Sequence, residues 1–333
     1  FELFVNGVSL ARHNNWRTLP SRVPFKVEKG KKYTIKIQYA QLNNWQANLE
    51  FDFGKEMDID FSSLINKLKG VDVVVFAGGL STLLEGEEMP VNYPGFKGGD
   101  RTDIELPEVQ RNCLKALKAA GKKLIFVNCS GSAIAFTPVM EYCDAILQAW
   151  YGGESGGQAV ADVLFGDYNP SGKLPVTFYK NSGQLKDFES YSMQGRTYRY
   201  MSDALFPFGF GLSYTAFSIG NAGAPDTILK KGDSLPLAIP VSNTGKRTGT
   251  EVIQVYVRKT TDSSGLLKTL RGFNRVTVPA GKTITTTITL PYRAFEFYND
   301  QKGEMCVTPG EYDVWYGNSS ADKDLKKISV RVK

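Results

Sequence analysis

Three apolar runs that each end in glycine constrain the fold of this chain more than any other feature of the sequence. They are VDVVVFAGG (71–79), KKLIFVNCSG (122–131) and CDAILQAWYGG (143–153). Segments that are apolar at consecutive positions are typical of parallel strands whose two faces are both buried. The sequence therefore predicts a parallel sheet built from these three segments, apolar on both faces.

Segments with a helical pattern lie between and beside the predicted strands. The clearest covers residues 107–121, where Pro107 stands in the first turn and Gly121 ends the helix. FSSLINKLKG (61–70) and SGGQAVADVLFGD (155–167) have the same character. Strands that alternate with helices predict a layered α/β domain, in which functional residues gather in loops at the carboxyl ends of the strands.

The parts of the chain on either side of this domain have β character. With 333 residues the chain is long enough for several domains. Residues 1–56 contain alternating segments and an Asn6-Gly7 turn, and residues 227–333 alternate apolar and polar side chains over about a hundred residues, as an antiparallel sandwich does. We expect four units: 1–56, the α/β domain 57–180, a connector 181–226 and the sandwich 227–333.

The connector is dense in aromatic residues, glycine and proline. Aromatic side chains bury large areas and often join packed units. We expect the Tyr and Phe side chains of the connector to seal the α/β domain against the sandwich, and five of them to be buried there: Tyr198, Tyr200, Phe206, Phe208 and Phe210.

The composition excludes several classes of protein. The only histidine is His13, far from every other candidate site, which argues against a Ser-His-Asp triad, a Cys-His pair or a histidine-rich zinc site. Four widely spaced cysteines suggest neither a metal site nor a disulfide framework. The net charge of +6 is spread along the chain, so no nucleic-acid partner is indicated, and no apolar run approaches the roughly 20 residues of a membrane span. No cofactor is expected.

Two further motifs could carry chemistry. One is a stretch similar to a phosphate-binding loop, YGGESGGQAVADVLFG (151–166), but its spacing matches no nucleotide-binding fingerprint. Its glycines are better explained by a sharp turn and the close packing of a helix. Cys129 and Ser130 stand at a strand end where a nucleophile could lie. They lack a histidine base, which makes a cysteine or serine hydrolase improbable.

A loop rich in carboxylates follows the first predicted strand. It reads LSTLLEGEEMPVNYPGFKGGDRTDIELP (80–107) and contains Glu85, Glu87, Glu88 and the pair Asp100-Arg101. Glycoside cleavage uses two carboxyl groups and no histidine, and an arginine can hold a carboxylate or a sugar hydroxyl. The alternative is an acidic loop exposed to solvent, without a catalytic role.

The longer motifs resemble one family, the C-terminal part of the family 3 glycoside hydrolases, which are β-glucosidases and β-xylosidases. They are LEGEE (84–88), GDRTDIELP (99–107), QAWYGGESGGQAVADVLFGDYNPSGKLPVTFY (148–179), GRTYRY (195–200), LFPFGFGLSYTAF (205–217) and LRGFNRV (270–276). The resemblance implies an α/β sandwich domain with a mostly parallel sheet and a C-terminal immunoglobulin or fibronectin type III-like β-sandwich. It also implies that residues 1–56 end a PA14-like domain.

In that family an N-terminal barrel supplies an aspartate nucleophile, and a loop of the α/β domain supplies the glutamate acid/base. The Glu-x-Glu form implies Glu87 as the acid/base, with Glu85 as the second choice and Arg101 as a candidate for substrate binding. The spacer EMPVNYPGFKGG (88–99) is longer than in the usual pattern. No segment of this chain has the pattern of a barrel, which alone takes roughly 250 residues.

The resemblance thus implies part of a retaining exo-β-glycosidase, inactive without the barrel, that acts on β-linked xylo- or gluco-oligosaccharides and is more similar to the β-xylosidases. It suggests a periplasmic or secreted bacterial protein. A competing hypothesis is a carbohydrate-binding or scaffold module without chemistry, in which Trp16 and Trp45 would stack on sugars instead of filling a β core. A third is an inactive member of the family.

Overall fold

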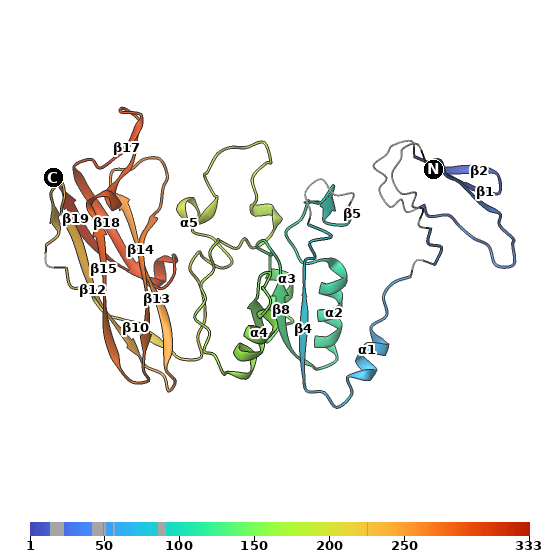
Figure 1. Cartoon of the computed structure of the whole chain (residues 1–333), viewed down its shortest axis with the longest axis horizontal. Coiled ribbons are helices and arrows are strands. Elements are labelled where there is room, and N and C mark those ends of the chain that lie inside the picture. The colour runs from blue at the N-terminus through green and yellow to red at the C-terminus, as the bar shows by residue number, and fades with distance from the viewer. Residues whose placement is uncertain (14–22, 42–48, 50, 56, 86–90, 225) are drawn as a thin grey trace.

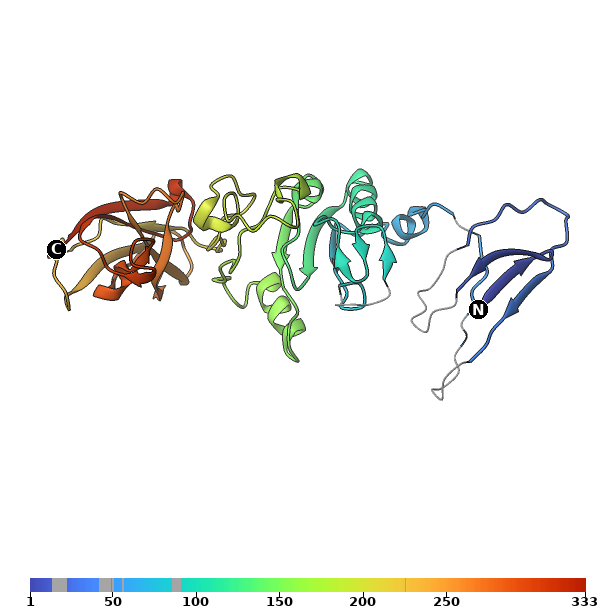
Figure 2. The ribbon, with the colours of Figure 1, turned by 90° about the horizontal axis from the view of Figure 1, so that it is seen from above.

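Three parts of the molecule lie in a row in the computed structural model (Figure 1). The structure describes residues 1–333 except 14–22, 42–48, 50, 56, 86–90 and 225. A small β-sheet lies at one end, the α/β domain in the middle and a β-sandwich at the other end. The view from above shows the same order (Figure 2). Trp16, Trp45 and Glu87 lie outside the described residues.

The N-terminal sheet has three antiparallel strands in the order β2-β1-β3. They are β1 (Glu2–Val5), β2 (Val8–Arg12) and β3 (Ile35–Gln38). Asn6 and Gly7 join β1 to β2 with φ angles of 51° and 82°, the left-handed conformation that an Asn-Gly hairpin turn requires. That turn is as the sequence predicted. The PA14-like origin of this sheet stays a prediction.

The α/β domain is built around a parallel sheet with the order β4-β8-β9. Its strands are β4 (Val73–Gly79), β8 (Lys123–Cys129) and β9 (Ala145–Gln148). Its helices are α1 (Ser62–Lys67), α2 (Glu108–Ala119), α3 (Thr137–Met140) and α4 (Gly156–Phe165). The three predicted strands are therefore present, parallel and adjacent.

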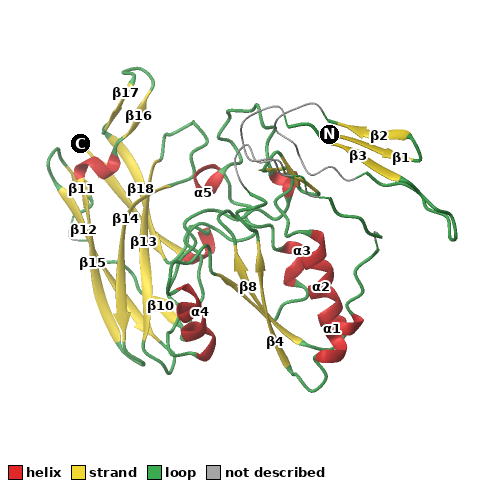
Figure 3. Cartoon of the chain, turned by 45° about the vertical axis from the view of Figure 1, so that its right-hand side comes forward, coloured by secondary structure: helices red, strands yellow, loops and turns green. Residues whose placement is uncertain are grey.

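The prediction that the sheet is buried on both faces was wrong for β4. Val74 and Phe76 pack against the core beneath α2, which includes Leu114 and Leu117. Val73 and Val75 alternate with them and are 46% and 50% exposed. Helices α1, α2 and α3 lie on one side of the sheet, whereas α4 lies on the other side, beside β8, and has no buried residue (Figure 3). Within the described part of the chain, no helix covers the second face of β4.

A small antiparallel sheet rises from the loop between β4 and α2. It consists of β5 (Asn92–Tyr93), β6 (Phe96–Lys97) and β7 (Asp100–Arg101). Gly98 and Gly99, both at positive φ, turn the chain from β6 into β7. Phe96 is buried in the domain core, which fixes this sheet to the α/β domain and leads the chain back to Arg101.

The connector holds the aromatic contacts that the sequence predicted, but not all of its aromatic residues. It contains η1 (Ser182–Gln184) and α5 (Thr197–Tyr200). The five named residues are partly buried, and none is exposed. Tyr198 stacks on Phe208 at 4.4 Å and meets Tyr256 of the sandwich edge-on, while Phe206 packs in the α/β core. The prediction that the connector's Tyr and Phe seal the interface was wrong for Phe188 and Tyr191, which are 100% and 98% exposed.

The C-terminal part is a sandwich of two sheets. One has the order β10-β12-β15, and the other has the order β11-β19-β18-β13-β14. The strands of the first sheet are β10 (Phe217–Ile219), β12 (Ser234–Asn243) and β15 (Thr283–Pro291). Those of the second are β11 (Ile228–Leu229), β13 (Gly249–Lys259), β14 (Thr269–Val278), β18 (Gly310–Gly317) and β19 (Leu325–Val332). The remaining elements are η2 (Tyr292–Phe295), β16 (Phe297–Asn299), β17 (Glu304–Cys306) and η3 (Asp322–Asp324).

The inner faces of both sheets supply one core. Alternate residues of β12 are fully buried, and they pack with apolar residues of β13 and β18 from the facing sheet. This is the period of two that the sequence pattern predicted.

Polar side chains lock the sandwich to the α/β domain. Lys173 and Glu251 form an ion pair at 2.7 Å with side chains only 12% and 7% exposed. The amide of Gln254 donates to the carbonyl of Gly209 in the connector at 3.1 Å and to that of Asn318 within the sandwich at 2.9 Å. Such buried pairing depends on precise geometry.

In the described part of the chain, no helix is long and apolar enough to cross a membrane.

Candidate active site

A pocket of about 560 Å³ opens at the carboxyl ends of the parallel strands, where the sequence analysis predicted the functional residues. It lies between the loop after β4, the loop after β8 and the start of the connector. Its lining residues are Glu85, Gly99, Asp100, Arg101, Ile104, Ser132, Ala133, Tyr179 and Leu185. The pocket therefore contains Glu85 and Arg101, two of the three residues that the sequence singled out.

Glycine and glutamine shape the end of β4. Gly79 has φ +130°, and a Cβ placed on it would lie 2.0 Å from the carbonyl oxygen of Cys129. The side chain of Gln110 on α2 accepts from the Gly79 N–H and donates to its carbonyl, at 2.9 and 2.7 Å. Only glycine fits here, and the pairing with Gln110 fixes the direction in which the chain leaves the strand toward Glu85.

Arg101 organises one wall of the pocket. Its Nη1 donates to Ser132 Oγ at 3.1 Å and to the carbonyl of Ala133 at 3.0 Å. Its Nε and Nη2 donate to the carbonyls of Asp103 and Glu105 at 3.0 and 3.3 Å. Burial lowers the pKa of Arg101, and the charge of Glu85 opposes that shift. The guanidinium side chain is 11% exposed and ties the loop after β8 to the chain that follows β7.

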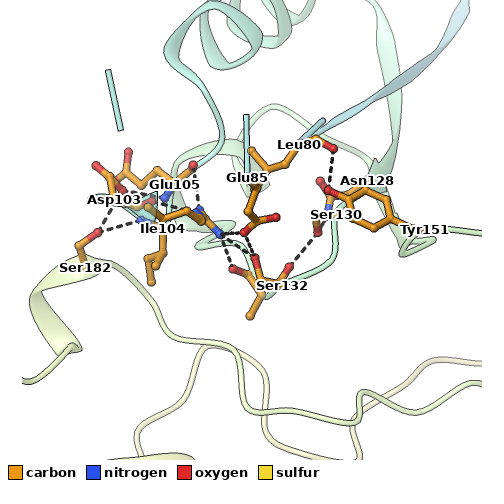
Figure 4. Close-up of polar contacts among 12 residues, drawn as sticks. Leu80, Glu85, Asp103, Ile104, Glu105, Asn128, Ser130, Ser132, Tyr151 and Ser182 are labelled. Carbon is orange, nitrogen blue, oxygen red and sulfur yellow. Dashed lines mark hydrogen bonds and ion pairs between the residues drawn. The ribbon is translucent and has the colours of Figure 1, made fainter. Parts of the chain in front are cut away.

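Glu85 is held by the same group of side chains (Figure 4). Its Oε1 accepts a hydrogen bond from Ser132 Oγ at 2.6 Å and lies 3.9 Å from Arg101 Nη1. Its side chain is 20% exposed. Ser132 thus joins a carboxylate and a guanidinium that lie 16 positions apart in the loop after β4.

A buried network of amide and hydroxyl side chains holds the backbone of Ser132. Asn128, at the end of β8, donates to Ser130 Oγ at 2.8 Å and to Gln148 Oε1 of β9 at 2.7 Å. Ser130 Oγ in turn donates to the Ser132 carbonyl at 2.8 Å. Asn128 and Ser130 are fully buried. Ser130 is therefore held in the interior of the domain by hydrogen bonds on both sides.

Tyr151 closes the network on the other side. Its hydroxyl donates to the carbonyl of Leu80 at 3.0 Å, and its ring blocks the space beside Gly131. Burial raises the pKa of Tyr151, and the charge of Glu85 adds to that shift. Tyr151 comes from the glycine-rich stretch considered above for nucleotide binding, and the structure gives this tyrosine a packing role.

The connector is attached to the pocket through a serine. Ser182 Oγ donates to Asp103 Oδ1 at 3.0 Å and accepts from the Ile104 N–H at 3.2 Å. This contact joins residues almost 80 positions apart and brings Tyr179 and Leu185 to the pocket. Sequence reasoning missed both Ser132 and Ser182. The only available signal was that Ser132 follows a predicted strand.

Family models match this chain over most of its length. The model described as glycosyl hydrolase family 3 C-terminal domain matches residues 16–214, more than half of the chain. The chain belongs to glycosyl hydrolase family 3. A second model, fibronectin type III-like domain, matches residues 251–320, within the sandwich. The family 3 chain thus combines an α/β sandwich domain with a fibronectin type III-like domain.

Individual relatives bear the names of two activities. A xylan 1,4-β-xylosidase from Xylanibacter ruminicola is 54% identical over 99% of this chain and 38% of its own length. A periplasmic β-glucosidase from Salmonella typhimurium is 36% identical over 77% of this chain and 34% of its own length. The crystal structure of a β-glucosidase from Listeria innocua in complex with isofagomine is 30% identical, with a TM-score of 0.68, over 81% of this chain and 38% of that one. The family 3 chain described here therefore spans between a third and two fifths of the length of these relatives.

Proposed function

We propose that this chain is part of a retaining exo-β-glycosidase that releases terminal β-linked sugars, and that the preferred sugar is xylose. The observation that carries the proposal is the pocket itself. It lies at the carboxyl ends of the parallel strands and is lined by Glu85 and Arg101, from the loop that the family resemblance marks as catalytic. The similarity to a xylan 1,4-β-xylosidase supports xylose, and β-glucosidase is the second candidate.

We propose Glu87 as the general acid/base. Glu85 Oε1 already accepts from Ser132 and faces Arg101, so this carboxylate is suited to fixing the loop. An acid/base residue must instead reach the glycosidic oxygen. Glu87 follows Glu85 by two positions in the sequence and is the other member of the Glu-x-Glu form. In this proposal, Glu85 positions the loop and Glu87 acts on the substrate.

The reaction needs a second carboxylate, which we place in a barrel outside residues 1–333. That carboxylate attacks the anomeric carbon while Glu87 gives a proton to the departing glycosidic oxygen. Glu87 then takes a proton from water as the water attacks the same carbon and frees the nucleophile. The two carboxyl groups of a retaining enzyme lie about 5–5.5 Å apart, so the barrel must meet this chain at the pocket. Residues 1–333 alone are then inactive.

Arg101 has a defined part in this proposal. Its bonds to described residues use four of the five N–H groups of a guanidinium. Within the described part of the chain, this leaves one N–H at Nη2, which we assign to a hydroxyl of the terminal sugar.

Periplasmic or secreted localisation is part of the same proposal, and the name of the Salmonella relative supports it. The competing carbohydrate-binding module depends on Trp16 and Trp45, which lie outside the described residues, so no observation here favours it.

The test is hydrolysis of aryl β-xyloside and aryl β-glucoside by the complete protein that contains this chain. The wild type is compared with Glu87→Ala, Glu85→Ala and, as a control, Glu88→Ala. Loss of an acid/base group typically lowers the rate by about 10²–10⁴-fold. We expect that loss in Glu87→Ala and recovery with azide, which attacks the glycosyl-enzyme without needing a base. The faster substrate identifies the sugar.

Other outcomes of this experiment would change the assignment. If azide restores Glu85→Ala instead of Glu87→Ala, the acid/base is Glu85. If Glu88→Ala alone loses turnover, neither member of the Glu-x-Glu form is the acid/base. If the wild type cleaves neither substrate, the proposed function is wrong.

A further inference from the structure

A second cavity lies between the α/β domain, the connector and the sandwich. Its volume is about 180 Å³, and it shares no lining residue with the pocket at Glu85. Each of the three parts contributes polar side chains to its wall: Ser171 and Lys173, then Ser213, then Thr250, Glu251 and Asn318. We call it the interdomain cavity. It is built from this chain alone and is separate from the candidate active site.

Two paired segments shape the interdomain cavity. The Leu174 N–H donates to the carbonyl of Phe210, and the Gly209 N–H donates to the carbonyl of Leu174, both at 2.8 Å. A Cβ placed on Gly211 would lie 2.1 Å from the carbonyl oxygen of Gly172, so the approach of these segments requires glycine. Gly172 and Gly211 both line the cavity. The wall is therefore preformed, which reduces the entropy lost when a ligand binds.

Lys173 brings unused hydrogen-bond donors to the interdomain cavity. Its Nζ lies 2.7 Å from Glu251 Oε1, and its side chain is 12% exposed. An ammonium group has three N–H donors, and Glu251 is the one partner of Lys173 Nζ within the described part of the chain. Leaving a buried donor without a partner costs free energy. Two N–H groups of Lys173 are therefore free to bind a molecule in the cavity.

Glu251, by contrast, already has its partners. Besides Lys173, its Oε1 accepts from the Val252 N–H at 2.8 Å, and its Oε2 accepts from Asn318 Nδ2 at 3.0 Å. Its side chain is only 7% exposed. Asn318 Oδ1 has no partner among the residues that the structure describes, so it can accept a further hydrogen bond. The cavity thus offers donors from Lys173 and an acceptor from Asn318.

The charges in the wall favour a neutral ligand. A metal cation would have to displace the Lys173 ammonium from Glu251, and an anion next to Lys173 would also lie close to the Glu251 carboxylate. A neutral molecule with hydroxyl groups meets neither obstacle, because a hydroxyl both accepts and donates hydrogen bonds.

The volume of the interdomain cavity limits the size of the ligand. At roughly 30 Å³ for each water molecule, 180 Å³ holds about six of them. Pockets for drug-sized ligands are larger, at about 300–1,000 Å³. The cavity therefore suits a compact molecule and is too small for an oligosaccharide.

We propose that the interdomain cavity binds a neutral polyhydroxyl molecule about the size of one monosaccharide. One hydroxyl oxygen accepts from the Lys173 ammonium, and another hydroxyl donates to Asn318 Oδ1. Because Lys173 belongs to the α/β domain and Asn318 to the sandwich, the bound molecule bridges the two and stabilises the folded chain. This inference does not depend on the proposed function, because the cavity contains no residue of the candidate active site.

The test is isothermal titration calorimetry on the complete protein that contains this chain. The probes are xylose, xylitol and sulfate, which represent a sugar ring, an open-chain polyol and an anion. Wild type is compared with Lys173→Met/Glu251→Leu, which removes both charges together. Loss of hydrogen bonds to a charged group weakens binding by about 10- to 100-fold. We expect wild type to bind one more equivalent of xylose or xylitol than this variant does.

Thr250→Phe is a second variant that keeps both charges and fills part of the interdomain cavity. It should lose the same equivalent of polyol. Thr277→Phe is the matched control, because Thr277 Oγ1 is hydrogen-bonded to Thr250 Oγ1 across the strands but does not line the cavity. We expect Thr277→Phe to bind the probes as wild type does. A saturating polyol should raise the melting temperature of wild type and of Thr277→Phe more than that of the two cavity variants.

Three results would overturn the inference. The first is equal binding of xylose and xylitol by wild type and both cavity variants, since the cavity then holds only water. The second is binding of sulfate, but of neither polyol, that the cavity variants lose, which would make this an anion site. The third is an equal loss in Thr250→Phe and Thr277→Phe, which would attribute the loss to the strand pair.

Hydrolysis of an aryl β-xyloside keeps this inference separate from the proposed function. Xylose held in the pocket at Glu85 contributes equally to all of these proteins, so the difference between them reports the interdomain cavity. The cavity variants should hydrolyse the aryl β-xyloside as wild type does. If wild type hydrolyses no aryl glycoside but the difference in polyol binding is present, the proposed function fails and the polyol site stands.

Discussion

The sandwich and the α/β domain differ in how completely the apolar faces of their sheets are covered. In the sandwich, the inner faces of two sheets cover each other, and the core draws on strands of both. In the α/β domain, one face of β4 packs beneath α2, and the other leaves Val73 and Val75 about half exposed. Two sheets that face each other close a core with strands alone, whereas a parallel sheet depends on helices from elsewhere in the chain.

The largest expected effect is in the sandwich core. Phe295 is fully buried and meets Tyr312 edge-on at 5.4 Å. We expect Phe295→Ala to lower the free energy of unfolding by about 3–5 kcal/mol, because it leaves a cavity that the two sheets cannot close. Urea denaturation followed by circular dichroism measures this. A loss below about 1 kcal/mol would mean that the sandwich core is less tightly packed than its burial indicates.

The contact between the two domains should be nearly as sensitive. Lys173→Met leaves Glu251 buried without its cation, and such a break costs about 3–5 kcal/mol. The double variant Lys173→Met/Glu251→Leu removes both charges and should recover most of the stability. A double-mutant cycle by urea denaturation measures the coupling. Equal losses in the single and double variants would show that packing, and not charge pairing, holds this contact.

An intermediate effect is expected at alkaline pH in the α/β domain. Burial raises the pKa of Cys143 to about 11, the nearby charge of Asp144 adds to the shift, and Lys118 opposes it. A thiol whose pKa is higher in the folded state loses its contribution as pH rises from the unfolded value of 9.0 to about 11. We expect the free energy of unfolding to fall across this window, and to fall less steeply in Cys143→Ala. Parallel curves for the two proteins would rule out this role of Cys143.

The smallest effect on stability is expected on the open face of β4. Val75 is 50% exposed, so Val75→Lys should change the free energy of unfolding by less than about 0.5 kcal/mol. The same change should reduce binding of a hydrophobic dye such as ANS by residues 1–333, because it places a charge on an apolar face. Val74→Lys, on the packed face, is the control and should destabilise strongly. If both variants destabilise alike, the two faces of β4 are equally packed.

Local pattern was enough to predict much of this fold. The Asn6-Gly7 turn, the helix at Pro107 and the alternation of β12 each depend on residues close together in the chain. The structure has all three, with Pro107 as the N-cap of α2 and not within its first turn. The exposure of Val75 could not be predicted in this way, because it depends on which helices cover the sheet.

The candidate site was predictable only in part. The loop after β4 and the residues Glu85 and Arg101 came from sequence motifs, and both residues line the pocket. Ser132 could not be found, because its contact with Glu85 joins residues 47 positions apart, and a serine after a strand has many ordinary roles. The exposure of Phe188 and Tyr191 could not be predicted either, because the sequence does not distinguish them from the packed aromatic residues of the same connector.

The connector has a practical consequence for anyone who wishes to divide this chain. Tyr198 packs against Tyr256 of the sandwich, while Phe206, only eight residues later, packs in the α/β core. A cut between them separates Tyr198 from the sandwich and Phe206 from the α/β domain, so each half loses an aromatic anchor. Truncation at a predicted domain boundary should therefore yield halves that aggregate and express poorly. The α/β domain and the sandwich are best produced together as one chain.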